Sequence, residues 1–221
     1  MITTPQLPGH IRKNDALFVY GASRKKPFVY TYLQDHVEVV GGPSCKSGVE
    51  IFTGRCENDG IPIRDRRGGG GTVVLAPGMV ITIIVDDRPE GVSATGIFNM
   101  IHNCMIGLLQ GRGIGNVERS GISDLSINER KILGSSLYMG TRPFLYYYQS
   151  SLMVSPDLSL MDRYLRYPPR EPQYRRGRSH RDFCTSLVEM EYGVTPEEIR
   201  DLFEADLPRC ISVAKEDSSS G

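Results

Sequence analysis

The sequence has no excess of either charge, no paired cysteine motif and no long apolar run, and each absence narrows the class of protein. Basic and acidic side chains balance at 26 each, so no global field recruits nucleic acid or an anionic membrane. The longest apolar run, residues 79–85, has the length of a strand and not of a membrane span. We therefore expect a protein with neither a nucleic-acid nor a membrane partner, in which any recognition of charge is local.

The cysteines are few and irregularly placed. There are five, with no CxxC pair and no zinc-binding spacing. An odd number favours reduced thiols over a disulfide framework. The first fifteen residues, MITTPQLPGHIRKND, lack the apolar core of a signal peptide. These features predict a cytoplasmic location.

The pattern of apolar residues predicts an α+β fold. Strands are expected at 28–33, 37–41, 61–63, 72–75, 79–85, 125–127, 131–137 and 145–154. Helices are expected after Ser93, Ser155 and Thr195, which read as helix-capping positions. Strands in runs with irregularly interspersed helices indicate mixed or antiparallel sheets with flanking helices, not a doubly wound parallel sheet. We expect residues 1–211 to form one domain and 212–221 to form a flexible polar tail.

A run of four glycines is the most unusual local feature. It lies in RDRRGGGGTVVL, residues 64–75, between an arginine pair and a strand. Bare backbone lets a charged ligand approach closely, and its N–H groups can point at phosphate oxygens. The usual phosphate motifs GxxxxGK[ST] and GxGxxG do not fit here. On spacing alone, a flexible surface loop with an incidental basic flank is an equal alternative.

Several motifs in order resemble the lipoate-protein ligase family of the biotin/lipoate ligase superfamily. The glycine run resembles the family motif RRxxGGGxV, and VEVVGG at 37–42 resembles the strand before it. SGISDLSINERKILGSS, residues 120–136, is similar to a block that ends in K-[IV]-x-G-[SA]. Residues 149–165 and 178–187 are similar to H-G-x-L-L-x-x-x-D-L and S-x-R-x-x-x-L. The resemblance covers roughly residues 28–187.

The resemblance implies a fold and a chemistry. The expected fold is the catalytic domain of class II biotin/lipoate ligases, with the accessory C-terminal domain absent from this chain or supplied as a separate subunit. The implied reaction joins ATP, with Mg²⁺, to lipoate or octanoate, forming lipoyl-AMP or octanoyl-AMP. The acyl group then passes to a lysine of a lipoyl-carrier protein or lipoyl domain. Two family histidines are replaced here, by Leu75 and Gln149, which puts the usual substrate specificity in doubt.

The family motifs also assign roles to residues. Lys131 is expected to be the catalytic residue, since a compact ammonium could contact both the acyl carboxylate and the α-phosphate. Asp124 is expected to orient Lys131 or to bind ribose or magnesium, with a turn-forming role as an equal alternative. Arg66 is expected to bind phosphate, with Arg67 as the alternative if the extra glycine shifts the register. The remaining expected nucleotide contacts are Gly69, Gly70, Gly71, Thr72, Val73, Val74, Gly134 and Ser135.

Basic residues cluster between Arg163 and Arg181, where seven arginines interleave with tyrosines. Such a segment resembles a nucleic-acid patch, but the chain is neutral and the aromatics follow no RNA-binding pattern. A solvated loop is the simplest interpretation. The family resemblance favours a mobile lid that also docks an acidic acceptor domain.

Three functions remain open at this level. The first is an ATP-dependent ligase. The second is an octanoyl or lipoyl transferase, which needs a nucleophilic cysteine beside the lysine. No cysteine lies between Cys104 and Cys184; a buried Cys104 thiol on a helix would be inert, and Cys184 stands at a position that is usually apolar in the family. The third is a non-catalytic protein that binds lipoyl-adenylate. We expect the ligase.

Overall fold

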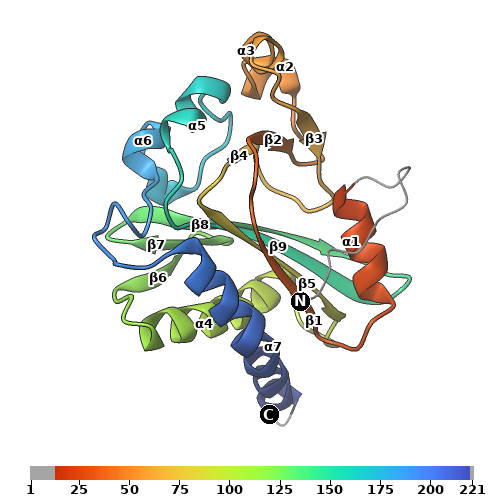
Figure 1. Ribbon diagram of the computed structural model, residues 1–221. Helices are drawn as coiled ribbons and strands as arrows, with labels where there is room; N and C mark the ends of the chain where they lie inside the picture. The colour runs from red at the N-terminus through yellow and green to blue at the C-terminus, as the bar shows by residue number, and fades with distance from the viewer. Residues whose placement is uncertain (1–12, 220–221) are drawn as a thin grey trace.

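Two sheets form the framework of the molecule, and the computed structural model describes them within residues 13–219 (Figure 1). The larger sheet has the strand order β1 (Phe28–Leu33), β5 (Met79–Asp87), β9 (Leu145–Met153), β8 (Arg130–Met139), β7 (Asp124–Ile127), β6 (Val117–Ser120), and the smaller has the order β3 (Ile63–Asp65), β2 (Glu38–Gly41), β4 (Val73–Leu75). The larger sheet is antiparallel, whereas β2 pairs with β3 in parallel and with β4 antiparallel. The predicted α+β fold with mixed and antiparallel sheets is confirmed.

Most predicted strands are present, but their partners could not be read from the sequence. The neighbouring runs β1 and β2 do not pair with each other, because β1 joins the larger sheet and β2 the smaller one. Strand β6 was not predicted. The apolar run in β5 is buried on both faces, from Met79 to Asp86. This fits its place between β1 and β9, with packed layers on both sides of the sheet.

Two long helices cover one face of the larger sheet (Figure 1). Helix α4 (Ala94–Gly111) begins at the predicted cap, where the Ser93 hydroxyl accepts from the Gly96 N–H at 3.2 Å. Helix α7 (Pro196–Ser219) begins with a reciprocal capping box between Thr195 and Glu198. None of the described helices is long and apolar enough to cross a bilayer.

Short elements cover the other face together with the smaller sheet (Figure 1). They are α1 (Lys13–Ala22), α2 (Ser47–Glu50), α3 (Thr53–Asn58), α5 (Ser159–Tyr164), the 3₁₀ turn η1 (Gln173–Arg175) and α6 (His180–Phe183). Only α5 was predicted, and it starts four residues after the proposed Ser155 boundary. The others are too short, or too weakly amphipathic, to leave a periodic signal in the sequence.

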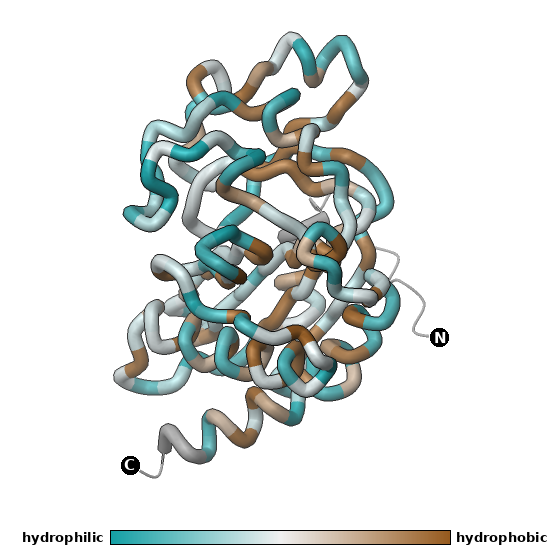
Figure 2. Tube along the Cα trace, turned by 90° about the vertical axis from the view of Figure 1, so that its left-hand side faces the viewer, coloured by the Kyte–Doolittle hydropathy of each residue, from teal (hydrophilic) through white to brown (hydrophobic). Residues whose placement is uncertain are grey.

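The core lies on both faces of the larger sheet. One cluster fills the space between the sheet and the pair α4 and α7, and a second lies between the sheet and the smaller sheet with α5. Figure 2 shows hydrophilic and hydrophobic residues alternating along the C-terminal helix, as expected for a helix that buries one side. Because α4 and α7 close one face of the larger sheet, a site on this sheet has to lie on its other face, beneath the smaller sheet and the short helices.

The predicted flexible tail at 212–221 is wrong for its described part. Helix α7 continues to Ser219, and Lys215 lies 2.8 Å from a carboxylate oxygen of Asp86. Asp86 is fully buried on β5 and also accepts a hydrogen bond from Tyr146. A buried carboxylate requires a partner, and this partner comes from a segment that looks solvated in the sequence. Residues 220–221 lie outside the described range.

The expectation that all cysteines are reduced is also wrong. A disulfide joins Cys104 of α4 to Cys210 of α7, and Cys45, Cys56 and Cys184 are free. In denaturant without reductant, we expect a thiol reagent to titrate three cysteines, and five after reduction. Five reactive thiols in the untreated protein, purified with thiols blocked at lysis, would contradict the pairing.

Candidate active site

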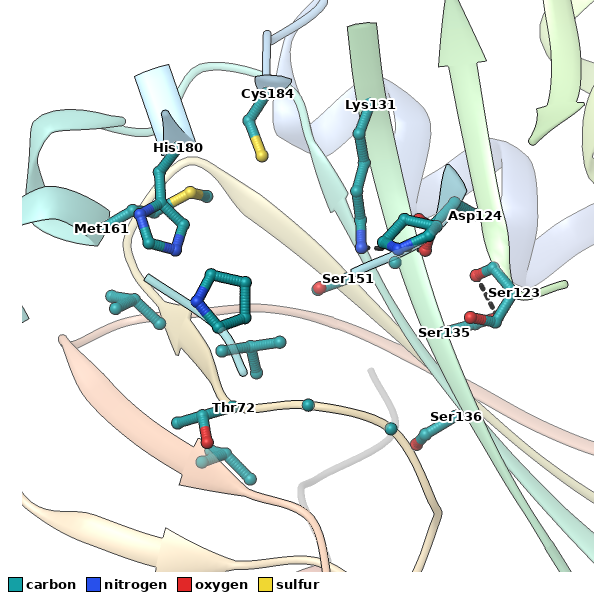
Figure 3. Close-up of a pocket in the computed structure, with 18 of the residues that line it drawn as sticks. Thr72, Ser123, Asp124, Lys131, Ser135, Ser136, Ser151, Met161, His180 and Cys184 are labelled. Atoms are coloured by element: carbon teal, nitrogen blue, oxygen red, sulfur yellow. Dashed lines mark hydrogen bonds and ion pairs between the residues drawn. The ribbon is translucent and has the colours of Figure 1, made fainter. Parts of the chain in front are cut away.

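A large cavity lies between the larger sheet and the elements above it (Figure 3). Its volume is about 910 Å³, which is near the upper end of the range for small-molecule sites. Its walls come from the glycine run and β4, from the start of β5, the first half of β8 and the second half of β9, and from residues 161–184. The cavity brings together segments that are more than a hundred residues apart in the chain.

The four glycines do not form a uniform flexible loop. A β-carbon on Gly68 would lie 2.5 Å from the Ser136 Oγ, so this position packs tightly against β8. Gly70 has a φ of +103°, which residues with side chains rarely adopt. Gly69 and Gly71 have open space where a β-carbon would point. The run is thus held at Gly68 and Gly70, and the cavity is lined by Gly70 and Gly71.

Arg66 holds this loop in shape. Its guanidinium donates to the carbonyls of Val40 (3.2 Å), Gly69 (3.0 Å) and Gly71 (2.7 Å). Burial lowers the pKa of Arg66 to about 10, which leaves it charged at pH 7. Its Nε–H has no hydrogen-bond partner among the described residues, and the side chain lines the cavity. The structure therefore gives Arg66 a role in organising the loop, and its predicted contact with phosphate stays a prediction.

Arg67 and Gly69 do not line the cavity. The Arg67 guanidinium lies over the rings of Phe18 and Tyr138, 5.5 and 5.7 Å from their centres. Successive residues at the start of the loop point in different directions, and only Arg66 points towards the cavity. Of the two arginines considered for phosphate binding, the geometry therefore favours Arg66 over Arg67. Gly69 contributes through its carbonyl, which Arg66 binds.

Thr72, Val73 and Val74 line the cavity, and their expected contacts with nucleotide stay predictions. The Thr72 hydroxyl donates to a carboxylate oxygen of Glu50 at 2.7 Å, and the other oxygen accepts from the Lys46 N–H at 3.0 Å. Glu50 is a buried residue of α2 that also lines the cavity. Sequence reasoning missed it, because α2 has only four residues and no recognisable motif.

Lys131 lies on β8 with its ammonium directed into the cavity (Figure 3). Its Nζ is 2.8 Å from the Asp124 Oδ1, and the two side chains are 21% and 9% exposed. Strand β7 carries Asp124 directly opposite Gly134 of β8. The pairing of the two strands therefore places the carboxylate beside the ammonium.

A bulge in β8 puts Lys131 and Gly134 on the same side of the sheet. Residues three apart on a regular strand face opposite sides. Here Leu125 pairs with Leu133, but Ser126 pairs with Lys131, so Ile132 is an extra residue on β8. A β-carbon on Gly134 would lie 2.7 Å from the Lys131 Nζ and 2.8 Å from its Cε. The missing side chain at Gly134 is the space in which the lysine lies.

Both oxygens of Asp124 are engaged by protein groups. Oδ1 pairs with Lys131, and Oδ2 accepts from the Tyr174 hydroxyl at 2.8 Å. Tyr174 belongs to η1 within the arginine-rich segment, so it ties that segment to the lysine. Of the roles predicted for Asp124, this geometry favours orienting Lys131. Sequence reasoning did not connect Tyr174 with Asp124, which is fifty residues away.

Ser135 lines the cavity and is held from behind by a buried histidine. Its hydroxyl donates to the Ser123 carbonyl at 2.7 Å and contacts the Nε2 of His102 at 3.1 Å. Burial lowers the pKa of His102 to about 4, so the ring is neutral. Because the single Ser135 proton is already used, the His102 Nε2–H is the donor. The nucleotide-binding role predicted for Ser135 stays a prediction.

The arginine-rich segment is largely paired within the molecule. Arg163 pairs with Asp59, Arg176 with Glu129, and Arg181 with Glu189. Arg166, Arg170 and Arg175 instead line the cavity. The predicted docking surface is therefore narrower than the sequence indicates, because four of the seven arginines pair with carboxylates once the pair of Arg175 with Glu171 is included. Its mobility and docking stay predictions.

The fold gives Lys131 a cysteine neighbour that the sequence does not show. Cys184 pairs with Lys131 in an isolated parallel bridge, and the Thr185 N–H donates to the Lys131 carbonyl at 2.9 Å. Cys184 lines the cavity but is only 5% exposed. Burial raises the pKa of its thiol to about 11, against the opposing effect of Lys131. The expectation that no cysteine stands near Lys131 is corrected, although this thiol is protonated at pH 7.

Part of the cavity wall is apolar. Its walls include Leu75, Met79, Ile81, Met153, Met161 and Phe183. Leu75 and Gln149, which replace family histidines, both line it. Among the side chains that the structure describes, no group of three or more His, Cys, Asp or Glu is placed to hold a metal ion. The residues do not form a dedicated magnesium site.

Three solved structures with the same fold are distant from this chain in sequence. A bi-partite lipoate protein ligase from Thermoplasma acidophilum is 21% identical, with a TM-score of 0.73 over 89% of this chain and 74% of that one. A lipoate-protein ligase A bound with ATP is 20% identical, with a TM-score of 0.73 over 91% and 77%. The T. acidophilum protein Ta0514 with bound lipoic acid is 19% identical, with a TM-score of 0.72 over 91% and 77%. These likenesses confirm the predicted fold.

The family itself is shown by the sequence match. The model of the lipoyl protein ligase A/B catalytic domain matches residues 15–207, which is most of the chain. The match includes the glycine run, the Lys131 block and the arginine-rich segment. The chain therefore belongs to the lipoyl protein ligase A/B catalytic domain family, and it is an enzyme of the ligase type.

Proposed function

We propose that this protein activates lipoate or octanoate with ATP and transfers the acyl group to a lysine of a lipoyl domain. In the first step the acyl carboxylate attacks the α-phosphate of ATP, pyrophosphate leaves, and an acyl-adenylate forms. In the second step the lysine amine attacks the acyl carbon, and AMP leaves. Both steps place negative charge at one point, so fixed cations there would stabilise the transition states.

The observation that carries the proposal is the placement of Lys131. Its ammonium is fixed by Asp124 over the bare backbone of Gly134, in a cavity that also contains the glycine run. A phosphate group of ATP bound at the glycine run and the carboxylate of an acyl chain bound against the apolar wall could then both contact the Lys131 ammonium. Fixed positions of this kind lower the barrier by orientation as well as by charge.

The two parts of the cavity suit the two substrates. The apolar wall formed by Leu75, Met79 and Met153 suits an acyl chain, whereas Arg66, Gly70 and Gly71 suit a nucleotide. Structures of the same fold contain lipoic acid in one case and ATP in another, which supports both assignments. Another was determined as a ligase with its E2 lipoyl domain, which supports a lipoyl domain as the acceptor. Magnesium is expected to arrive with ATP and stays a prediction.

The test follows each half-reaction separately. The protein is incubated with ATP, magnesium and either lipoate or octanoate, and the acyl-adenylate is measured by mass spectrometry. A lipoyl domain in its unmodified form is then added, and its intact mass is followed. The proposal requires the acyl-adenylate and then a single acyl addition at one lysine. Tight binding of acyl-AMP without turnover would instead indicate a non-catalytic adenylate-binding protein.

A thioester transferase is the second candidate, because Cys184 lies beside Lys131. Such an enzyme needs a thiolate, and burial raises the pKa of Cys184 to about 11. We therefore expect no acyl adduct on the protein after exposure to an octanoylated carrier without ATP at pH 7. We also expect Cys184→Ala to retain ATP-dependent acylation. A hydroxylamine-sensitive octanoyl adduct on Cys184 would establish the transferase instead.

A further inference from the structure

A histidine lies opposite Lys131, at an unspecified position of the segment 178–187 that resembles S-x-R-x-x-x-L. His180 is the first residue of α6, and Figure 3 shows its ring in the pocket on the far side of Cys184 from Lys131. Cys184 joins the two elements, since its N–H donates to the His180 carbonyl and its backbone forms the bridge with Lys131. The imidazole and the ammonium therefore face one cavity from adjacent segments.

Asp162 of α5 fixes which nitrogen of His180 is available. The Nδ1 lies 3.1 Å from the Asp162 Oδ1. An ionised carboxylate can only accept, so Nδ1 carries the proton and Nε2 is left with a free lone pair. None of the side chains and backbone groups that the structure describes forms a hydrogen bond with Nε2. The His180 side chain is 11% exposed, so the pocket is the principal access to this nitrogen.

We propose that His180, oriented by Asp162, is the base that deprotonates the acceptor lysine in the transfer step. This inference rests on the proposed function. A free lysine has a pKa of about 10.4 and arrives as an ammonium, which is not a nucleophile. Its first proton passes to the His180 Nε2, and the amine then attacks the acyl carbon of the adenylate. The new C–N bond replaces the C–O bond, AMP leaves with the bonding pair, and the second nitrogen proton leaves with AMP or to water.

The other ionisable groups that line the cavity are poorly suited to this role. Both carboxylate oxygens of Glu50, Asp124 and Glu171 already accept hydrogen bonds or ion pairs from the chain. Burial raises the pKa of Tyr32 and Tyr174 far above neutral. The Cys184 thiol is protonated, and the remaining groups are cations. Among the described lining residues, His180 is the one with a basic nitrogen, Nε2, whose lone pair is available to a group in the cavity.

Burial is the main reason that His180 is neutral at physiological pH. Burial, followed by repulsion from Arg175 on η1, lowers the pKa of His180 below 6.5, while Asp162 opposes this shift. These are the two charged groups that face His180 from other elements. A neutral ring at pH 7 can accept a proton, and the Asp162 carboxylate then stabilises the imidazolium. The same pair returns the proton to water after AMP has left.

The experiment separates proton transfer from every other property of the site. Wild type and His180→Gln receive synthetic octanoyl-AMP, and the acceptor is either a lipoyl domain or hydroxylamine. Hydroxylamine is uncharged at pH 7 and needs no base. We expect His180→Gln to lower the rate of transfer to the lysine by about 10²–10³-fold, and the rate of octanoyl-hydroxamate formation by less than about threefold. His36→Gln is the matched control, since His36 also pairs with a carboxylate (Asp35) but lies outside the cavity.

Two further measurements identify the role as that of a base. Asp162→Asn should lower the rate of lysine transfer while sparing the hydroxylamine reaction, because it removes the group that orients the ring. In His180→Gly, added imidazole should restore transfer to the lysine. Lysine transfer by His180→Gln within threefold of wild type would overturn the proposal, and so would an equal loss with both acceptors. Failure of the wild type to form octanoyl-AMP from ATP and octanoate would instead reject the proposed function.

Discussion

Replacing Lys131 with alanine is expected to lower acyl-adenylate formation by about a thousandfold or more, with the fold retained. The ammonium is the cation that β8 places in the cavity beside Asp124, and its removal leaves developing negative charge without a fixed partner. A carboxylate also becomes unpaired, which makes the site repel the acyl carboxylate. The measurement is pyrophosphate release together with octanoyl-AMP by mass spectrometry. Adenylate formation near the wild-type rate would show that Lys131 is not the catalytic residue.

A loss of activity has to be separated from a loss of stability. Asp124 is 9% exposed, and Tyr174 still donates to it in the variant. We therefore expect a stability loss of about 1–3 kcal/mol in urea unfolding. Lys215→Ala is the matched control, because it removes an ammonium from the buried Asp86 at a distance from the cavity. It should lower stability by a comparable amount without lowering the adenylation rate.

Residues that the sequence singles out by a local pattern lie together in one cavity. The glycine run places bare backbone near the cation Arg66. The block KILGSS, residues 131–136, places a lysine a few residues before a glycine and a serine. The structure brings these segments to one cavity, together with Asp124. The helix caps at Ser93 and Thr195 were also predictable, because a cap depends on residues within one turn.

The sequence fails where a residue's role depends on a distant partner. Lys215 reads as part of a solvated tail until Asp86 is seen beside it. Cys104 reads as an isolated thiol until α7 brings Cys210 to it. The bulge at Ile132 is a property of two paired strands, so no single-strand pattern predicts that Lys131 and Gly134 face the same way.

Replacing Gly134 with valine is expected to lower adenylate formation by about 10²–10³-fold while leaving the protein folded. The added β-carbon would lie 2.7 Å from the Lys131 Nζ, and the flexible lysine would give way rather than the strand. Its ammonium would move off Asp124 and out of the position that the reaction needs. Valine suits a strand better than glycine does, and this gain should offset part of the stability lost with the Lys131–Asp124 pair. The adenylation rate and the melting temperature are measured on the same samples.

A double-mutant cycle decides whether Gly134→Val acts through Lys131 alone. If valine only displaces the ammonium, it has nothing left to displace in Lys131→Ala, and the double variant should be no slower than Lys131→Ala. If Gly134 also leaves room for the adenylate itself, valine would block the nucleotide in either background. The double variant would then lose a further factor of ten or more in octanoyl-AMP affinity, measured by calorimetry. Fully independent losses in rate and affinity would contradict the inference that the missing side chain at Gly134 is there to accommodate the lysine.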